Sequence, residues 1–328
     1  MTMLKFLIKR ILVMIPTLLG ILFIIFTINY FTPGDPALNA LGSNYTEEAY
    51  QAKRAEMGLD QPFLVRYGLY LRDLVTKFDM GTSYSTLRPV RDMIAERLVP
   101  TVKIGLISSI LTVIIGVLVG IISAVKQYSI TDYICTTLAI FFAAMPGFWL
   151  SLMCMLVFCV HLNWLPTSGL TTWKHYILPV LSLAIGPIAV VMRMTRSSML
   201  DVIRQDYIRT ARAKGLSERV IIYRHALKNA LIPVITIIGM QLSMVVSGSV
   251  ITESIFSIPG IGMLMLNAIG NRDYPVIQST VLVLSFAICV VNLLVDIAYA
   301  FADPRIRAQY TANNRKKDKR KAGKGVTA

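Results

Sequence analysis

Charged side chains are scarce in this sequence. Asp, Glu, Lys and Arg make up 16% of its 328 residues and hydrophobic residues make up 55%, whereas a soluble domain averages about 25% charged residues. The mean hydropathy of +0.62 shows that uncharged polar residues do not fill the deficit. This composition excludes a disordered chain and argues against an ordinary soluble enzyme, so we expect lipid to surround much of the protein.

Residues that hold metals or form disulfides are also few. The cysteines lie in apolar runs and form no CxxC pair, which argues against a disulfide framework. The histidines do not have the spacing of metal ligands. We therefore expect no metal site and no cofactor. The residues concerned are Cys135, Cys154, Cys159, Cys289, His161, His175 and His225.

Catalytic patterns are missing as well. No GxxxxGK[ST] motif occurs, so the chain should not bind ATP through a P-loop. Several serines fall in apolar runs, but no histidine lies at membrane depth to activate one as a nucleophile. Small hydroxyls in membrane helices usually serve helix packing. We expect no catalytic residue and a chain that is not an enzyme.

Long apolar runs are what the sequence does have. About 20 such residues cross a bilayer as a helix, and six runs meet that length. A seventh, at 254–271, is shorter and is interrupted by Pro259 and glycines, so we expect it to dip back within an outer loop at 253–278. The predicted fold is an all-α polytopic membrane protein with six transmembrane helices, at 11–31, 99–125, 134–160, 176–195, 230–252 and 279–300.

The placement of basic residues predicts the orientation. Lys and Arg dominate at 1–10, 196–229 and 301–328, but not at 32–98 or 253–278. Basic segments face the cytoplasm, and these three share one side only if six helices cross. We therefore expect cytoplasmic termini, a cytoplasmic loop at 196–229 and an exported segment at 32–98. The net charge of +15 and the basic tail could suggest nucleic acid, but we favour a tail that fixes topology beside lipid.

Within the exported segment two helices are predicted. Thr46 can cap a helix over 45–57 that Gly58 ends, because a hydroxyl at the start and a glycine after the end mark helix boundaries. Apolar residues recur with a helical period over 61–78. We expect these helices to pack on the membrane domain.

Polar residues inside the predicted spans are candidates for function. Asp296 and Asn292 lie one helical turn apart, and an acid inside a membrane is costly enough to suggest a function. Asp296 could instead pair with a basic group such as Arg193, or reach water. We expect Glu253, at the end of a span, to be solvated. Gly116-x-x-x-Gly120 predicts close approach of another helix.

The cytoplasmic loop has a pattern of its own. A helix should run to a stop at Gly215, after which Ser217 can cap a second helix over 218–231. Two short helices meeting at a glycine corner would form an outward knob that can dock into a partner's groove. The alternative is a pair of helices held on the membrane surface by their arginines.

The stretch DYIRTARAKGL at 206–216 resembles the cytoplasmic coupling loop of bacterial ABC importer permeases of the dipeptide, oligopeptide and nickel group. The resemblance extends over nearly the whole chain, and the long segment after the first helix resembles the B-type subunit. Further motifs follow in the family's order at 33–36, 79–83, 88–90, 165–169, 177–179, 193–199, 252–262, 272–276 and 303–305.

The resemblance implies a type I ABC importer permease fold with an exported helical insertion after the first helix, in a bacterial cell membrane. It implies inward movement of peptides, or of a solute such as a nickel chelate, by alternating access. The implied partners are a second homologous permease, two cytoplasmic ATPases that hydrolyse the ATP and an external solute-binding protein. The residues it assigns to ATPase coupling are Tyr207, Arg209, Thr210, Ala211, Ala213, Lys214, Gly215 and Leu216.

Two other functions remain open from the residues alone. A channel or a secondary transporter could work without ATPases, although no chain of buried charges indicates proton coupling. A polytopic sensor or scaffold could read an external ligand through 32–98.

Overall fold

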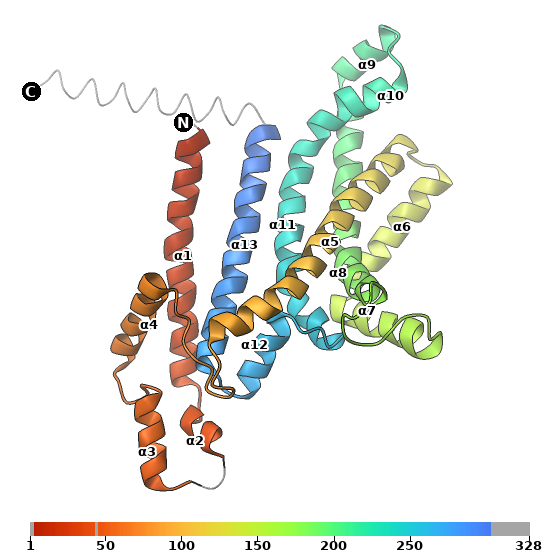
Figure 1. Ribbon diagram of the computed structural model, residues 1–328. Helices are drawn as coiled ribbons and strands as arrows, with labels where there is room; N and C mark the ends of the chain where they lie inside the picture. Colours follow the sequence, from red (N-terminus) through yellow and green to blue (C-terminus); the bar gives the residue numbers. More distant parts are fainter. Residues whose placement is uncertain (1–2, 43–44, 303–328) are drawn as a thin grey trace, which may run out of the picture.

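The computed structural model describes residues 3–42 and 45–302 (Figure 1), and in that part of the chain the regular structure is helical apart from one isolated bridge between Thr82 and Pro89. The helices are α1 (Met3–Phe31), α2 (Pro36–Leu41), α3 (Glu47–Glu56), α4 (Phe63–Lys77), α5 (Val90–Val125), α6 (Ile130–Ala144), α7 (Gly147–Cys154), η1 (Met155–His161), α8 (Lys174–Ile203), α9 (Asp206–Ala213), α10 (Glu218–Val220), η2 (Ile221–Ala226), α11 (Leu227–Ile255), α12 (Ile261–Gly270) and α13 (Tyr274–Ala302).

In the part of the chain that the structure describes, five helical stretches are long and apolar enough to cross a membrane. A bent pair, Ile130–Ala144 with Gly147–His161, makes a sixth if it counts as one span. The all-α polytopic architecture is therefore confirmed, whereas the exact residues in the bilayer stay a prediction. The five are Leu7–Phe31, Val90–Val125, Lys174–Ile203, Glu218–Ile255 and Tyr274–Ala298.

The helix expected over 134–160 is not one rod. The helix axis bends by 103° between its two halves. The break falls at Met145, just before Pro146, where the backbone is extended (φ −82°, ψ 131°). The residue before a proline avoids the helical region because the proline ring collides with it. Pro146 therefore ends one helix and starts the next.

Close contact between α5 and α8 forms the centre of the bundle. A Cβ atom added at Gly116 would lie 2.8 Å from the Val191 Cβ, and one at Gly120 would lie 2.6 Å from the Thr195 Cβ. Larger residues would hold the two helices apart, because small residues let membrane helices approach closely. The prediction from the glycine spacing is confirmed.

The insertion at 32–98, whose export stays a prediction, forms two helices where the sequence predicts them, α3 and α4. The Thr46 Oγ1 accepts a hydrogen bond from the Ala49 N–H at 3.2 Å and caps α3. Phe63 and Tyr67 on α4 pack edge-to-face against Phe23 and Phe26 on α1, with ring centroids 5.4 to 5.8 Å apart. Figure 1 shows α2, α3 and α4 beside the lower half of α1 and beyond its end, so the insertion packs on the bundle as expected.

The segment between α11 and α13 folds back into the protein. It forms the short apolar helix α12, whose Ile261, Gly262 and Ala268 are buried. In Figure 1 α12 lies beside the beginnings of α5 and α13. The predicted basic tail falls outside the described residues from 303 onwards.

Candidate functional site

The predicted knob lies at the end of the bundle opposite the insertion with α2, α3 and α4, where Figure 1 shows α9 and α10 above the other helices. α9 is amphipathic. Its Ile208 and Ala211 are 0% and 8% exposed and join a core cluster with Ile121, Met199 and Ile221. Burial of this face fixes the knob on α5, α8 and the start of the α10–α11 helix.

Gly215 forms the corner of the knob. Its φ is +77°, and its N–H donates to the Arg212 carbonyl at 2.9 Å. This left-handed end is where glycine avoids a side-chain clash. A Cβ there would meet nothing within 4 Å. The positive φ, and not a lack of room for a side chain, therefore favours glycine at this position. The Arg212 guanidinium donates to both Glu218 carboxylate oxygens, at 2.7 and 3.2 Å, and braces the corner.

Seven of the eight predicted coupling residues are exposed on the knob. Tyr207 and Leu216 are 43% and 41% exposed and offer large apolar surface, while the Tyr207 hydroxyl accepts a hydrogen bond from the Asn229 Nδ2 at 2.8 Å. Ala211 differs, because the period of α9 turns it into the core, so it supports the knob from inside. The exposed ones are Tyr207, Arg209, Thr210, Ala213, Lys214, Gly215 and Leu216.

The second helix of the knob is longer than expected. Ser217 stands at its start, but its side chain makes no capping hydrogen bond. The helix does not stop near residue 231, because α10 continues through a π-helical turn at Ile221–Ala226 into α11. The knob is therefore one end of a helix that runs to Ile255.

The polar residues of the last helix contact two different neighbours. The Asp296 Oδ1 accepts from the Arg10 Nη2 at 2.9 Å, so an ion pair forms as one of the two interpretations expects, with Arg10 in place of Arg193. The Asn292 Oδ1 accepts from the Ser243 Oγ at 3.1 Å. Asp296 joins α13 to α1 and Asn292 joins α13 to α11, and no hydrogen bond links the two over 3–42 and 45–302.

Glu253 corrects an expectation, because it is fully buried and not solvated. Its carboxylate accepts hydrogen bonds from the Thr101 Oγ1 at 2.7 Å and from the Gly262 and Met263 N–H groups at 2.7 and 3.2 Å. The Thr101 Oγ1 in turn accepts from the Ile261 N–H at 2.9 Å. The carboxylate thus caps α12, where a negative charge is favourable, and ties it to α5 and α11.

Two glycines make room for this carboxylate. A Cβ at Gly260 would lie 2.3 Å from the Glu253 Cδ, and one at Gly262 would lie 2.5 Å from the Val250 Cα. We call Glu253, Thr101 and the first turn of α12 the Glu253 latch. Gly260 and Gly262, which follow Pro259, are the sequence signal for it.

Asp132, a buried acid at the same end of the bundle as the knob, was also missed from the sequence. Asp132 is 3% exposed, and its two oxygens accept from the Arg196 Nε and Nη2, both at 2.7 Å. The Ser123 hydroxyl and the Tyr128 N–H donate to it as well. This two-point contact has the geometry that makes arginine–carboxylate pairs strong, and it fixes the α5–α6 turn to α8.

Comparison with protein families accounts for most of the chain. Residues 116–308 match the family described as binding-protein-dependent transport system inner membrane component, and residues 3–105 match its N-terminal counterpart. The chain belongs to this family. It is therefore a multi-pass inner membrane component of a transport system that works with a binding protein.

Named relatives resemble this inner membrane component over almost its whole length. The dipeptide transport system permease protein DppB of Alkalihalophilus pseudofirmus is 43% identical in an alignment of 333 positions that covers 93% of this chain and 100% of that protein. The glutathione transport system permease protein GsiC of Pectobacterium atrosepticum is 42% identical over 305 residues, which are 93% and 99%. The resemblance seen in the sequence motifs is confirmed.

The fold of this inner membrane component also occurs among solved structures. An inward-facing structure of the MetNI methionine ABC transporter matches with a TM-score of 0.55 and 17% identity, over 65% of this chain and 97% of that one. At this identity the match establishes the fold alone. The expected ABC importer permease fold is confirmed.

Proposed function

We propose that this inner membrane component is the permease subunit of an ATP-driven importer that moves peptides, in the size range of dipeptides and glutathione, into the cell. The solute class is taken from the relatives that transport dipeptides and glutathione. A related small solute such as a nickel chelate would use the same path.

The observation that carries the coupling role is the knob itself. Tyr207 and Arg209 project from α9, a short helix whose other face is buried in the bundle, and Leu216 is exposed just after the Gly215 corner. A partner that pushes on the exposed face therefore acts on α5, α8 and the long α10–α11 helix together. Such an arrangement suits transmission of a two-state movement, which alternating access requires.

The proposed assembly contains a second homologous permease, two cytoplasmic ATPases that dock on the knobs and an external solute-binding protein. ATP hydrolysis takes place in the ATPases and not in this chain. Closure of the ATPases on ATP pushes the knobs and shifts the population of the permeases towards the outward-open state. The binding protein then releases its solute into the opening.

The proposed orientation follows from the charge pattern. The knob and both termini face the cytoplasm, and the insertion with α2, α3 and α4 is exported. The opposite placement of knob and insertion in Figure 1 supports this arrangement.

The test is purification of the complex from its native membrane, followed by uptake of a labelled dipeptide into proteoliposomes. Two ATPases and a second permease should copurify. Uptake into the proteoliposomes should require ATP in the lumen, on the side where the ATPases dock. Uptake by this chain alone would favour a channel or a secondary transporter. External-ligand binding with no uptake would favour a sensor.

A further inference from the structure

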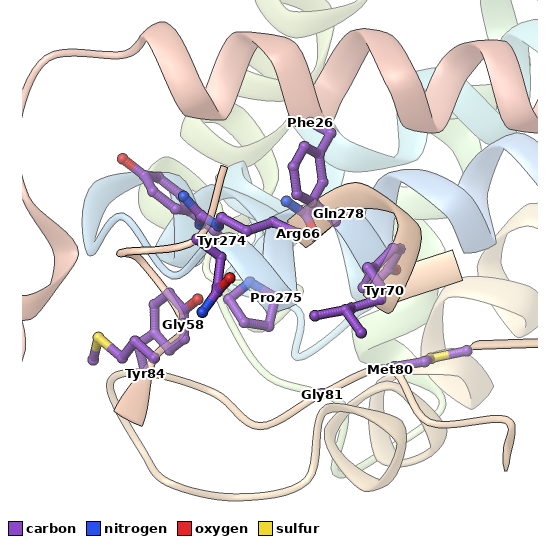
Figure 2. Close-up of a pocket in the computed structure, with 13 residues that line it drawn as sticks. Phe26, Gly58, Arg66, Tyr70, Met80, Gly81, Tyr84, Tyr274, Pro275 and Gln278 are labelled. Carbon is purple, nitrogen blue, oxygen red and sulfur yellow. The ribbon is translucent and has the colours of Figure 1, made fainter. Parts of the chain in front are cut away.

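A partly open cavity of about 190 Å³ lies between the insertion and the bundle (Figure 2), far from the knob. It is contributed by α1, the α3–α4 turn, α4, the segment before α5 and the start of α13. An apolar cavity of about 150 Å³ is known to hold benzene, so this one has room for a molecule of about six to nine heavy atoms. Its lining is Phe26, Met57, Gly58, Gln61, Arg66, Leu69, Tyr70, Met80, Gly81, Tyr84, Tyr274, Pro275 and Gln278.

Arg66 places a positive charge in this cavity, which we call the Arg66 pocket. Its guanidinium carbon lies 5.9 Å from the centre of the Phe26 ring, and Figure 2 shows the side chain extending towards Tyr274. Among residues 3–42 and 45–302 no carboxylate forms an ion pair with Arg66. A guanidinium presents a fixed fork of donors that matches a carboxylate.

Gln278 is the second unusual member of the lining. Only 5% of this residue is exposed, yet its amide makes no hydrogen bond within the described part of the chain. Its amide atoms are not fully enclosed and reach the cavity, so they are available to hydrogen-bond a ligand that enters it.

The aromatic residues add donors and apolar walls. Burial raises the pKa of Tyr84 to about 12, although the nearby Arg66 opposes this rise. The phenol therefore stays protonated at physiological pH and can donate a hydrogen bond. Tyr274 is 7% exposed, and with Phe26, Leu69 and Pro275 it lines the pocket with apolar surface.

The acids closest to the pocket are already satisfied and do not line it. Asp273 accepts from the Ser83 hydroxyl and from the Tyr84 and Ser85 N–H groups. Asp35 accepts from Tyr50 and Arg54. Among the described residues that line the pocket there is no Asp or Glu, so no carboxylate there would pair with an ammonium group.

We propose that the Arg66 pocket binds a small carboxylate with a compact apolar body and no free ammonium group. Arg66 binds the carboxylate, Gln278 donates to it or to a neighbouring carbonyl, and the aromatic walls enclose the apolar part. Nothing in this assignment depends on the proposed transport role, and the site lies apart from the coupling knob.

The test uses the purified full-length chain in nanodiscs of phosphatidylcholine alone. Calorimetry compares 4-methylpentanoate with leucine, which carries the same apolar body plus an ammonium group, and with 4-methylpentanamide, which lacks the charge. We expect saturable binding of the carboxylate, weaker binding of leucine and no measurable binding of the amide. Equal affinities for acid and amide, or binding of the acid only above about 10 mM, would overturn the proposal.

Variants locate the site. Arg66→Gln should weaken 4-methylpentanoate binding by about tenfold or more, the range for a charge-assisted hydrogen bond, and Gln278→Leu should weaken it less. Arg72→Gln is the matched control, because Arg72 lies on the same helix, is 57% exposed and pairs with Asp73 outside the pocket. Equal weakening by both arginine variants would contradict the site.

Two further arms separate folding and lipid effects. Arg66→Lys keeps the charge and should retain part of the affinity, so complete loss in a variant with an unchanged melting temperature would contradict the role of the charge. Phosphatidylglycerol added to the nanodiscs should leave the affinity unchanged. Competition by this anionic lipid would mean that a lipid headgroup, and not a free carboxylate, is the natural occupant, and would refute the proposal.

Discussion

Glu253 offers the sharpest test of how α12 is held in place. Glu253→Ala would leave the Gly262 and Met263 N–H groups without their acceptor, while the Thr101 hydroxyl, which also loses Glu253, could turn to the Arg97 carbonyl at 3.3 Å. An unsatisfied buried donor costs about 1 to 3 kcal/mol. Because water can enter the vacated space and accept some of these hydrogen bonds, we expect the free energy of unfolding to fall by about 2 to 5 kcal/mol in total.

Glu253→Gln should be much milder. Its carbonyl oxygen can still accept from the α12 N–H groups, and its amide can donate to the Thr101 Oγ1, whose own proton can turn to the Arg97 carbonyl 3.3 Å away. Glutamine also avoids the cost of burying a charge. We expect a loss of about 1 kcal/mol.

Thermal unfolding in detergent measures the loss of global stability, and amide hydrogen exchange measures the local opening of the first turn of α12. The Ala variant should melt well below the Gln variant, and its amides at residues 261–263 should exchange faster than wild type. Glu96→Ala, which removes a carboxylate that is 54% exposed, is the control and should change little. An Ala variant as stable as wild type, or one matched by the Gln variant, would refute the reasoning about the latch.

Three further predictions concern the knob at Gly215, the Arg10–Asp296 ion pair and the orientation. Gly215→Val should reach the membrane but lose the ATPases or uncouple their hydrolysis from uptake, because a branched residue is strained at this backbone by about 1 kcal/mol or more. Gly215→Asn is the control, because asparagine tolerates that backbone. Full uptake by the Val variant in a copurification and uptake assay would count against the role of the knob. Asp296→Asn should leave insertion intact but lower assembly or coupling, and exchanging the charges of Arg10 and Asp296 should restore it; normal transport by the Asn variant would show that the pair is dispensable. In a background without native cysteines, an impermeant thiol reagent should label Thr46→Cys in intact cells but Lys214→Cys only after lysis, and equal labelling would contradict the orientation.

Much of the architecture follows from local sequence. Apolar runs determine where long helices form, because a helix in lipid satisfies its own backbone hydrogen bonds. Thr46 and Gly215 mark helix boundaries correctly, since capping and left-handed conformations depend on the residue itself and its neighbours. Gly116 and Gly120 predict a close helix contact without saying that α8 supplies it. Pro146 indicates the bend between α6 and α7, but the length of the uninterrupted apolar run favours the prediction of a single helix.

The tertiary structure alone decides which distant groups meet. Asp296 pairs with Arg10, 286 positions away, because α1 and α13 happen to pack side by side. Glu253 is buried because α12 folds back and brings its free N–H groups to the carboxylate. Arg66 and Gln278 share a pocket because α4 packs on α1 and reaches α13 through the Tyr70–Ser279 hydrogen bond. Local sequence sets conformation and hydrophobic faces, but the pairing of polar groups depends on how whole helices dock, and docking is determined by the surfaces of many residues together.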